Sequence, residues 1–278
     1  MKTRNGFTLL ETPKEIKVYL DKQKITRNIN GLQCHHTYEP DYNCWKNTDK
    51  KVFAEPHFGR TESLNEWGKT QWNYKDAKGK YIAQHFTVFP DGMIVTGRSL
   101  NSTPIGIKGW NTGKVCIEIY GNFDKGKDKM TDAQRKAVIA LFGELCRYFK
   151  LVPGPNTIRY HAWFTSGGTY LKDYIYGRSR KTCPGTAFFG GNTMDAFKEN
   201  FLPQVKKYFS NGEVEEFKPH IVRVTADILN VREHSNSSSE IVGKISKGDA
   251  YTIVKEDGKW GYLKSGLGWI HLGYTEKI

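Results

Sequence analysis

Alternating apolar and polar positions predict strands in the middle of the chain. Residues 81–89 (YIAQHFTVF) and 93–98 (MIVTGR) are rich in β-branched and aromatic side chains, and they flank the turn residues 90–92 (PDG). This arrangement predicts a β-hairpin. Residues 114–121 (KVCIEIYG) read as a further, buried strand.

Helical periodicity follows directly after these strands. Over residues 130–150, apolar side chains recur at a spacing of three and four, and Thr131 with Gln134 has the spacing of a capping box. A second helix is predicted over residues 192–209. Strands followed by helices predict an α/β (α+β) fold for this part, with a central mixed β-sheet and helices packed on it.

The last 60 residues have a different pattern of apolar and turn residues. Short β-rich runs are separated by turn residues, which is typical of a small all-β barrel. These runs cover residues 228–233, 250–257, 259–264 and 268–274.

This change of pattern predicts two domains joined by a linker. Residues 210–220 (SNGEVEEFKPH) combine Gly, Pro and charge without apolar periodicity, which predicts a linker. We therefore expect an N-terminal domain over residues 1–209 and a C-terminal all-β domain over residues 221–278.

Charge narrows the classes of partner. The net charge is +13; residues 219–278 hold 8 Lys+Arg and 7 Asp+Glu, so 34 basic and 22 acidic residues, or +12, remain for residues 1–218. A basic surface favours an anionic partner. Nucleic acid is not favoured, because no nucleic-acid-binding motif is present. The sequence also lacks a run of about 18 apolar residues, so it does not predict a segment that spans a membrane.

The beginning of the chain and the cysteines bear on location. Residues 1–22 lack the apolar run of a secretory signal, so we expect the protein to remain in the cytoplasm of the cell that makes it until it is released. Five cysteines without a C-x-x-C pair are then expected to be reduced.

Two histidines and a cysteine are candidate metal ligands. His35 and His36 stand where an apolar run ends, His161 ends another β-like run, and Cys183 precedes a proline and a glycine. Each has a structural interpretation when taken alone. Together, two imidazoles and a thiolate would form a zinc site assembled in three dimensions, with one position left for water.

Glu118 and Lys181 are candidate catalytic residues. Glu118 interrupts the strand VCIEIY, where a carboxylate is costly unless it is partnered, exposed on an edge or used as a base. Lys181 lies two residues before Cys183 in a basic run. It is either one more solvated charge or a cation beside a developing oxyanion.

The order of these motifs resembles that of zinc-dependent N-acetylmuramoyl-L-alanine amidases of the phage-lysozyme and peptidoglycan-recognition-protein superfamily. The similarity covers residues 30–205, and the C-terminal residues resemble a bacterial Src-homology-3-like wall-binding domain. The amidase motifs are HHT (35–37), QHF (84–86) with DG (91–92), Asn111 then VCIE (115–118), TDAQ (131–134), YH (160–161) and KTCP (181–184).

The resemblance implies a role for each matching residue. The zinc ligands would be His35, rather than His36, with His161 and Cys183, and the catalytic pair would be Glu118 and Lys181. A tyrosine that some relatives place near the metal is Gln84 here, which favours Glu118 as the base, and Cys116 replaces the glycine of the family's IGIE strand. Weaker candidates for substrate contact are Gln84, His85, Trp110, Asn111 and Trp163, where core packing is the alternative for the tryptophans.

The implied activity is cleavage of the amide bond between the lactyl group of N-acetylmuramic acid and L-alanine of the stem peptide. The partners implied are peptidoglycan of a Gram-positive wall and its anionic teichoic polymers, with no nucleic acid. The missing export signal favours a phage endolysin that acts on the wall after release.

Two alternatives remain open from the sequence. One is a recognition protein that binds peptidoglycan without cutting it, although such a binder has no need of Cys183, Glu118 and Lys181. The other is a thiol endopeptidase with Cys34 or Cys44 as nucleophile, although neither cysteine begins a clear helix in the sequence.

Overall fold

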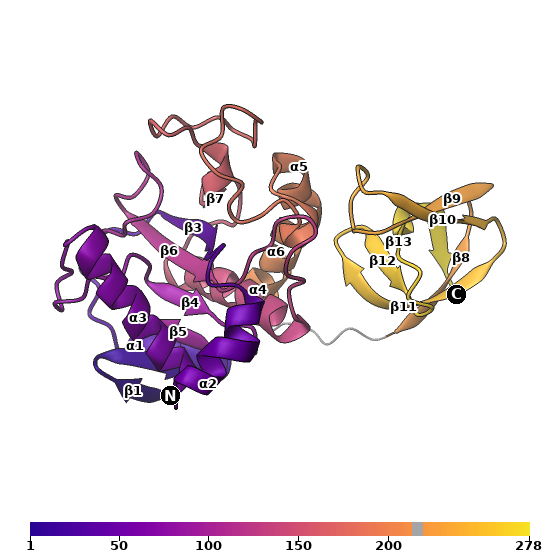
Figure 1. Ribbon diagram of the computed structural model, residues 1–278. Coiled ribbons are helices and arrows are strands. Elements are labelled where there is room, and N and C mark those ends of the chain that lie inside the picture. Colours follow the sequence, from indigo (N-terminus) through magenta and orange to yellow (C-terminus); the bar gives the residue numbers. More distant parts are fainter. Residues whose placement is uncertain (213–218) are drawn as a thin grey trace.

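The N-terminal part of the protein is built on one seven-stranded sheet. The computed structural model describes residues 1–212 and 219–278 (Figure 1). Strands β4, β6, β3 and β7 run parallel to one another, and β1, β2 and β5 extend the sheet in antiparallel fashion. In spatial order the strands are β1 (Lys2–Arg4), β2 (Phe7–Leu10), β5 (Ile94–Thr96), β4 (Phe86–Val88), β6 (Lys114–Ile119), β3 (Gly31–His36) and β7 (Ile158–Tyr160).

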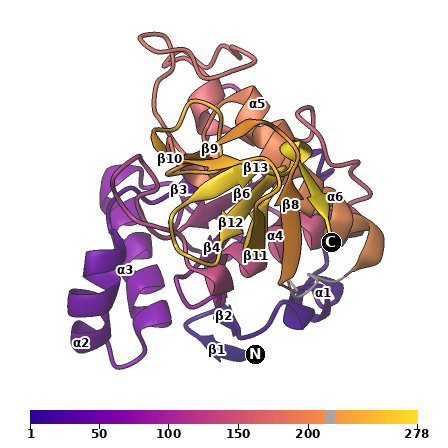
Figure 2. The ribbon, with the colours of Figure 1, turned by 90° about the vertical axis from the view of Figure 1, so that its right-hand side faces the viewer.

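Helices cover both faces of this sheet. Helices α1, α4 and α6 pack together on one side, and α3 with η1 lies against β2 and β5 on the other (Figures 1 and 2). The helical segments are α1 (Lys14–Asp21), η1 (Cys44–Asp49), α2 (Lys50–Val52), α3 (Pro56–Gln71), α4 (Asp132–Tyr148), η2 (His161–Trp163), η3 (Phe188–Gly190), α5 (Met194–Ala196), η4 (Phe197–Phe201) and α6 (Leu202–Asn211). The mixed sheet with packed helices confirms the predicted fold class of this part.

The predicted hairpin and buried strand are present. The hairpin is β4 and β5, shorter than the apolar runs because residues 81–85 are not in a strand. The buried strand is β6, whose residues are buried except for the partly buried Glu118. A strand flanked by neighbours on both edges and helices on both faces has no solvent side, which explains its continuous apolar character.

Helix α4 confirms the first predicted helix but corrects its capping. The Thr131 hydroxyl accepts a hydrogen bond from the Gln134 backbone N–H at 3.0 Å, as in a capping box. The Gln134 side chain, however, turns into the core and donates to the carbonyl oxygens of Val88 (2.9 Å) and Tyr120 (2.8 Å). It also accepts from the Tyr42 hydroxyl, which in turn accepts from the Thr131 N–H. Gln134 gives the Tyr120 carbonyl, just beyond β6, a donor in an apolar interior. It adds a second donor to the Val88 carbonyl at the end of β4, which also accepts from the Tyr120 N–H.

The second predicted helix is one helical run over residues 194–211 with a widened turn inside it. Thr193 caps its start by accepting from the Ala196 N–H at 3.2 Å. The turn η4 is π-helical and directly precedes the segment that holds Pro203. Proline lacks the N–H of a regular α-helix, and a π-turn is one way for the run to continue past it.

The C-terminal part forms a second seven-stranded sheet, which is antiparallel throughout (Figure 1). It encloses its own apolar core, which includes Val224, Val231, Ile253 and Ile270. The strands, in spatial order, are β10 (Ile241–Ser246), β9 (Ile228–Arg232), β13 (Trp269–His271), β12 (Trp260–Leu263), β11 (Ala250–Asp257), β8 (His220–Val224) and β14 (Thr275–Lys277), with a short turn of helix η5 (Leu272–Tyr274) before β14.

The all-β class predicted for this part is confirmed. The four predicted runs correspond to β9, β11, β12 and β13, whereas β8, β10 and β14 were not predicted. Among the described strands no pairing joins β10 to β14, so closure into a barrel stays a prediction.

The domain boundaries also stay a prediction. Helix α6 ends at Asn211 and β8 begins at His220, and residues 213–218 of the predicted linker lie outside the described residues. Within the described part of the chain, no helix has both the length and the apolar character needed to cross a bilayer.

The buried Gln134 side chain gives a test of the fold. Gln134→Met keeps the volume but leaves the Tyr120 carbonyl without its donor and the Tyr42 hydroxyl without its acceptor. The Val88 carbonyl keeps its bond from the Tyr120 N–H. We expect the free energy of unfolding to fall by about 2–4 kcal/mol, since each unsatisfied buried group costs roughly 1–3 kcal/mol. Urea denaturation measures it, with Lys136→Met at an exposed position of the same helix as the control. Equal stability of the two variants would show that the Gln134 hydrogen bonds contribute little.

Candidate active site

The candidate active site lies where three parallel strands end. Strand β3 is paired with β6 on one side and β7 on the other, so the carboxyl ends of all three strands lie at one edge of the sheet. His35 and His36 are the last residues of β3, Glu118 lies opposite His35 in the β3–β6 register, and His161 follows β7 directly. Sites of open sheets characteristically lie at this edge.

Three side chains converge there with the spacing of metal ligands. The Nδ1 atoms of His35 and His161 are 3.3 Å apart, and the Cys183 Sγ is 3.6 Å from the His35 Nδ1. All three donor atoms lie within 4.8 Å of one another. A tetrahedral zinc ion with Zn–N of about 2.0–2.1 Å and Zn–S of about 2.3 Å requires N···N of about 3.3 Å and N···S of about 3.6 Å. The donor set therefore fits zinc, and the two distances from the His35 Nδ1 match those of a tetrahedral site.

Gln33 fixes the orientation of His35. It stands two residues earlier on the same face of β3, and its Oε1 accepts from the His35 Nε2 at 3.2 Å. The Gln33 amide is itself held, because its Nε2 donates to the Trp110 carbonyl and to the Asn111 Oδ1 (3.0 Å). With the proton on Nε2, the lone pair of Nδ1 points to the ligand group, as an outer-shell partner of a metal-binding histidine requires.

Backbone and side-chain hydrogen bonds hold the Cys183 segment against the strand ends. The Cys183 carbonyl accepts from the Ala162 N–H at 2.6 Å, and its Sγ accepts from the His36 N–H at 3.4 Å. Asp124 accepts from the Thr182 hydroxyl (3.0 Å) and from the Thr186 N–H (2.9 Å), so it closes the loop on both sides of the cysteine.

His36 points away from this group. Its Nδ1 accepts from the Phe123 N–H at 3.2 Å, and its ring packs edge-on against Tyr38. Successive side chains of a strand point to opposite faces, so only one of the two adjacent histidines can join the group. The choice of His35 agrees with the expectation from the sequence.

Burial sets the charge states of the three candidate ligands. It lowers the pKa of His35 well below its usual value, assisted by His161 and Lys181, and it lowers the pKa of His161 to about 4. Both imidazoles are therefore neutral, which is the form that binds a metal. Burial raises the pKa of the Cys183 thiol, and the nearby Glu118 adds to this. A bound cation would reverse that effect and favour the thiolate.

Glu118 and Lys181 line the same cleft as the three ligands. Burial raises the pKa of Glu118 to about 7, and the Lys181 ammonium acts in the opposite direction. A carboxyl group whose pKa lies close to neutrality can both accept and return a proton. Lys181 is exposed in the cleft wall, where its charge can act on a bound anion.

The cleft has a volume of about 760 Å³, and one of its walls was not predicted. Trp67 of α3 and Trp72 beyond it line this wall, with ring centroids 4.7 Å apart in an edge contact. Their exposed fractions are 51% and 39%, unusually high for tryptophan. Tyr38 and Arg60 line it as well. The buried residues of α3 include two glycines and a threonine, so the apolar spacing that reveals a helix is weak in this segment.

Of the five weaker candidates for substrate contact, Gln84 lines the cleft and the other four do not. Trp163 is fully buried and donates its Nε1–H to the Asn192 carbonyl at 2.7 Å, so core packing is the interpretation that holds. His85 is also buried, with Nδ1 accepting from the Cys116 N–H at 2.9 Å.

Trp110 and Asn111 contact residues around the site. The Trp110 ring packs under the Lys114 and Arg159 cations. The Asn111 Oδ1 accepts from Gln33 and from the Gly106 N–H (3.1 Å), which supports the Gln33–His35 pair. Neither side chain lines the cleft, and substrate contact by them stays a prediction.

The structure does not support the thiol alternative. Cys34 is fully buried and Cys44 is half-buried, and neither lines the cleft. Cys44 is the first residue of the π-helical segment η1, but the helical run starts at Tyr42, so neither cysteine begins a helix. Burial also raises the pKa of both thiols, whereas a nucleophilic cysteine needs a lowered pKa.

Solved structures with some likeness to this chain share less than a quarter of its sequence. Comparison with curated proteins found no match. Among solved structures, N-acetylmuramoyl-L-alanine amidase LysC from Clostridium intestinale URNW is 21% identical, with a TM-score of 0.39 over 58% of this chain and 80% of that one. Drosophila peptidoglycan recognition protein SA is 14% identical, with a TM-score of 0.43 over 65% of this chain and 83% of that one.

Two family matches divide the sequence. Residues 227–276 match the bacterial SH3 domain. Residues 25–186, more than half of the chain, match the N-acetylmuramoyl-L-alanine amidase family and contain every candidate ligand and catalytic residue. The chain therefore belongs to the N-acetylmuramoyl-L-alanine amidase family and carries a bacterial SH3 domain.

Proposed function

We propose that the protein is a zinc-dependent hydrolase that cleaves the amide bond between the lactyl group of N-acetylmuramic acid and L-alanine of the peptidoglycan stem peptide. One observation carries the proposal. The donor atoms of His35, His161 and Cys183 lie within 4.8 Å of one another in a cleft that Glu118 and Lys181 also line. Membership of the amidase family supports the same bond as the target.

The three ligands define what the metal would contribute. A zinc ion bound by His35, His161 and Cys183 would supply a Lewis acid that lowers the pKa of bound water and polarises a carbonyl group. Three protein ligands leave one position of a tetrahedron open, which is the arrangement of catalytic sites and not of structural ones.

Glu118 is proposed as the proton carrier. Its carboxylate lies opposite His35 on a strand with neighbours on both edges, so its position is fixed by the sheet. It would accept the proton of the attacking water and pass it to the amine of the departing L-alanine. A pKa of about 7 suits both transfers, because the group is then neither too weak a base nor too weak an acid.

Lys181 and the aromatic wall are proposed to act on the substrate. The Lys181 ammonium would stabilise the negative charge that develops on the carbonyl oxygen of the scissile amide. The exposed Trp67 and Trp72 rings offer apolar faces on which a sugar ring or a stem-peptide side chain can pack. In this proposal, catalysis takes place at the end of the cleft next to the strand ends, and the substrate binds along the wall formed by α3.

The natural target is proposed to be the peptidoglycan of a Gram-positive wall. The bacterial SH3 match and the net charge of +13 support binding to a wall with anionic teichoic polymers. The phage origin and the release from a host cytoplasm stay predictions of the sequence. A recognition protein that binds without cutting is the competing outcome in the following test.

Digestion of purified Gram-positive peptidoglycan tests the reaction. We expect new N-terminal L-alanine, which disappears after treatment with a chelator and returns when zinc is added. End-group analysis before and after digestion measures it. New N-termini from other residues that a chelator does not affect would contradict the proposal. Binding to the wall without any new ends would identify a recognition protein instead.

Glu118→Gln tests the proton carrier. The amide cannot accept the proton of the attacking water, so we expect turnover to fall by roughly 10²–10⁴-fold while zinc binding persists. Glu39→Gln is the matched control, since Glu39 lines the same cleft. Near-normal turnover of the Glu118→Gln protein would remove Glu118 from the mechanism.

Gln33→Met tests the orientation of His35. Methionine preserves the volume but cannot accept the His35 Nε2–H, so we expect zinc to bind roughly 10–100-fold more weakly. Competition with a chromophoric chelator measures the affinity, and Gln71→Met at an exposed position is the control. Unchanged affinity would mean that Gln33 does not set the orientation of His35.

A further inference from the structure

The C-terminal sheet contacts the catalytic domain through a buried carboxylate. Asp257, the last residue of β11, is only 3% exposed. One of its oxygens accepts from the Arg135 guanidinium of α4 at 2.5 Å and from the Gln204 amide of α6 at 3.2 Å. The other accepts from the Ser235 hydroxyl of its own domain at 2.7 Å. Donors from both domains thus converge on one side chain.

The burial and pairing of the Asp257 carboxylate indicate a specific interface between the two domains. A buried charge is costly unless it is paired and hydrogen-bonded, and Asp257 obtains its cationic partner from the other domain. The Arg135 guanidinium also lies over the Phe189 ring at 4.1 Å, so the arginine is packed as well as paired. A second ion pair, Lys255 with Asp132, joins the same two elements nearby.

The surfaces also fit sterically at the turn that follows Asp257. Gly258 has φ +60°, and a Cβ atom at this position would lie 2.0 Å from the Glu199 carbonyl oxygen of η4. Only a glycine allows the turn to approach the helix so closely. On the other side of the contact, the Asn236 amide donates to the Gly190 carbonyl at 3.0 Å.

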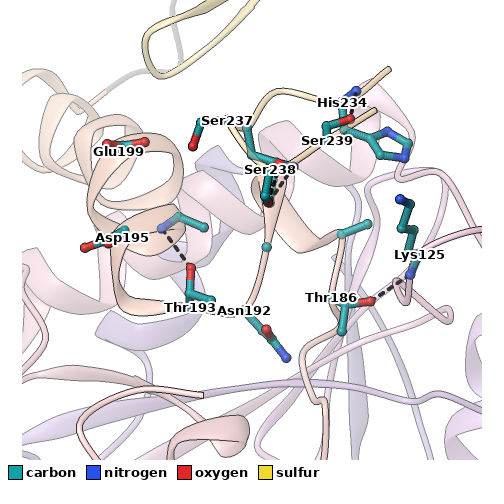
Figure 3. Close-up of a pocket in the computed structure, with 15 residues that line it drawn as sticks. Lys125, Thr186, Asn192, Thr193, Asp195, Glu199, His234, Ser237, Ser238 and Ser239 are labelled. Atoms are coloured by element: carbon teal, nitrogen blue, oxygen red, sulfur yellow. Dashed lines mark hydrogen bonds between the residues drawn. The ribbon is translucent and has the colours of Figure 1, made fainter. Parts of the chain in front are cut away.

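A polar pocket of about 260 Å³ separates the two surfaces elsewhere (Figure 3). Thr186, Thr193 and Glu199 of the catalytic domain face it from one side, and His234 and Ser238 of the C-terminal domain face it from the other. The direct contacts at Asp257, Gly258 and Asn236 lie beside this pocket, and Asp257 and Gly258 are the ones that the variants below address.

The contact reaches the segment that carries a candidate metal ligand. Asn236 binds the backbone at Gly190, seven residues after Cys183. Two residues further, the Asn192 amide donates back to the Thr182 carbonyl at 2.7 Å. The loop from Thr182 to Asn192 is thus closed on itself, with Cys183 on the cleft side and the C-terminal domain on the other.

We propose that the SH3 domain is docked on α4, η4 and α6 as a fixed part of the enzyme, and that it supports the loop that holds Cys183. The support of the loop rests on the proposed function, because it assumes that Cys183 binds zinc. The docking does not depend on it. The domain is then a structural component of the site in addition to a wall-binding module.

Gly258→Asn is designed to separate the domains without disturbing the turn. Asparagine tolerates positive φ, so the β11–β12 turn is kept while the new side chain collides with Glu199. Gly266→Asn is the matched control, since Gly266 also has positive φ, in the β12–β13 turn, and a Cβ there meets nothing within 4 Å. Arg135→Gln is a second variant whose change lies outside the C-terminal domain, with Lys136→Gln as its control.

Small-angle X-ray scattering of the full chain measures the docking. We expect wild type and both control variants to scatter as one compact particle, and Gly258→Asn and Arg135→Gln to show a larger radius of gyration. An extended wild type, or test variants as compact as their controls, would overturn the docking. This readout does not depend on any activity, so failure of the amidase proposal would leave it intact.

Binding of Zn²⁺ in competition with a chromophoric chelator measures the support of the loop. We expect roughly tenfold weaker zinc binding in the undocked variants than in their controls, as for loss of an outer-shell support. Undocking with unchanged zinc affinity would overturn the support of Cys183. A protein that binds no zinc in any form would instead contradict the proposed metal centre.

Discussion

The register of β3 between its two parallel neighbours is the constraint on which the site depends. His35, Glu118 and His161 come from three segments distant in sequence, and they meet because β3, β6 and β7 end at one edge. Side chains of a strand alternate with a period of two, so a slip of one residue would turn His36 toward the ligand group and His35 away from it. Helices on both faces and strands on both edges hold this register. The Gln33–His35 pair uses the same alternation, because residues two apart share a face.

Burial then gives these residues their chemical character. The same apolar surroundings keep His35 and His161 neutral, raise the pKa of the Cys183 thiol and bring the pKa of Glu118 to about 7. Without a cation these groups are neutral, so they can lie close together with little electrostatic repulsion. A divalent cation would draw the thiol toward its thiolate, whereas the imidazoles are already in the binding form. A metal bound as proposed would thus complete the electrostatics of the site.

The sequence allowed the candidate ligands and the carboxylate of the site to be predicted, but not the aromatic residues that line the cleft. The candidate histidines stand at the ends of apolar runs and Glu118 interrupts one, so strand periodicity and side-chain type both carry information there. Helix α3 was not predicted, because its buried side includes Gly59, Thr61 and Gly68 and therefore has no apolar periodicity. The exposed Trp67 and Trp72 were not identified as candidates for the same reason. Gln134 was seen only as a cap because its hydrogen bonds to the sheet depend on tertiary structure. Strands β8, β10 and β14 are short or largely exposed and give little apolar signal.

The docking of the two domains is a still clearer case of information that only the fold supplies. In sequence, Asp257-Gly258 is an ordinary hairpin turn, and nothing in it indicates that the carboxylate is buried or that the glycine meets a helix. The donors that justify the burial, Arg135 and Gln204, are 122 and 53 residues away. One loop, Thr182 to Asn192, has the cleft on one side and this contact on the other. Because the loop is held from both sides, the position of Cys183 depends on the C-terminal domain as well as on the strands that carry the histidines.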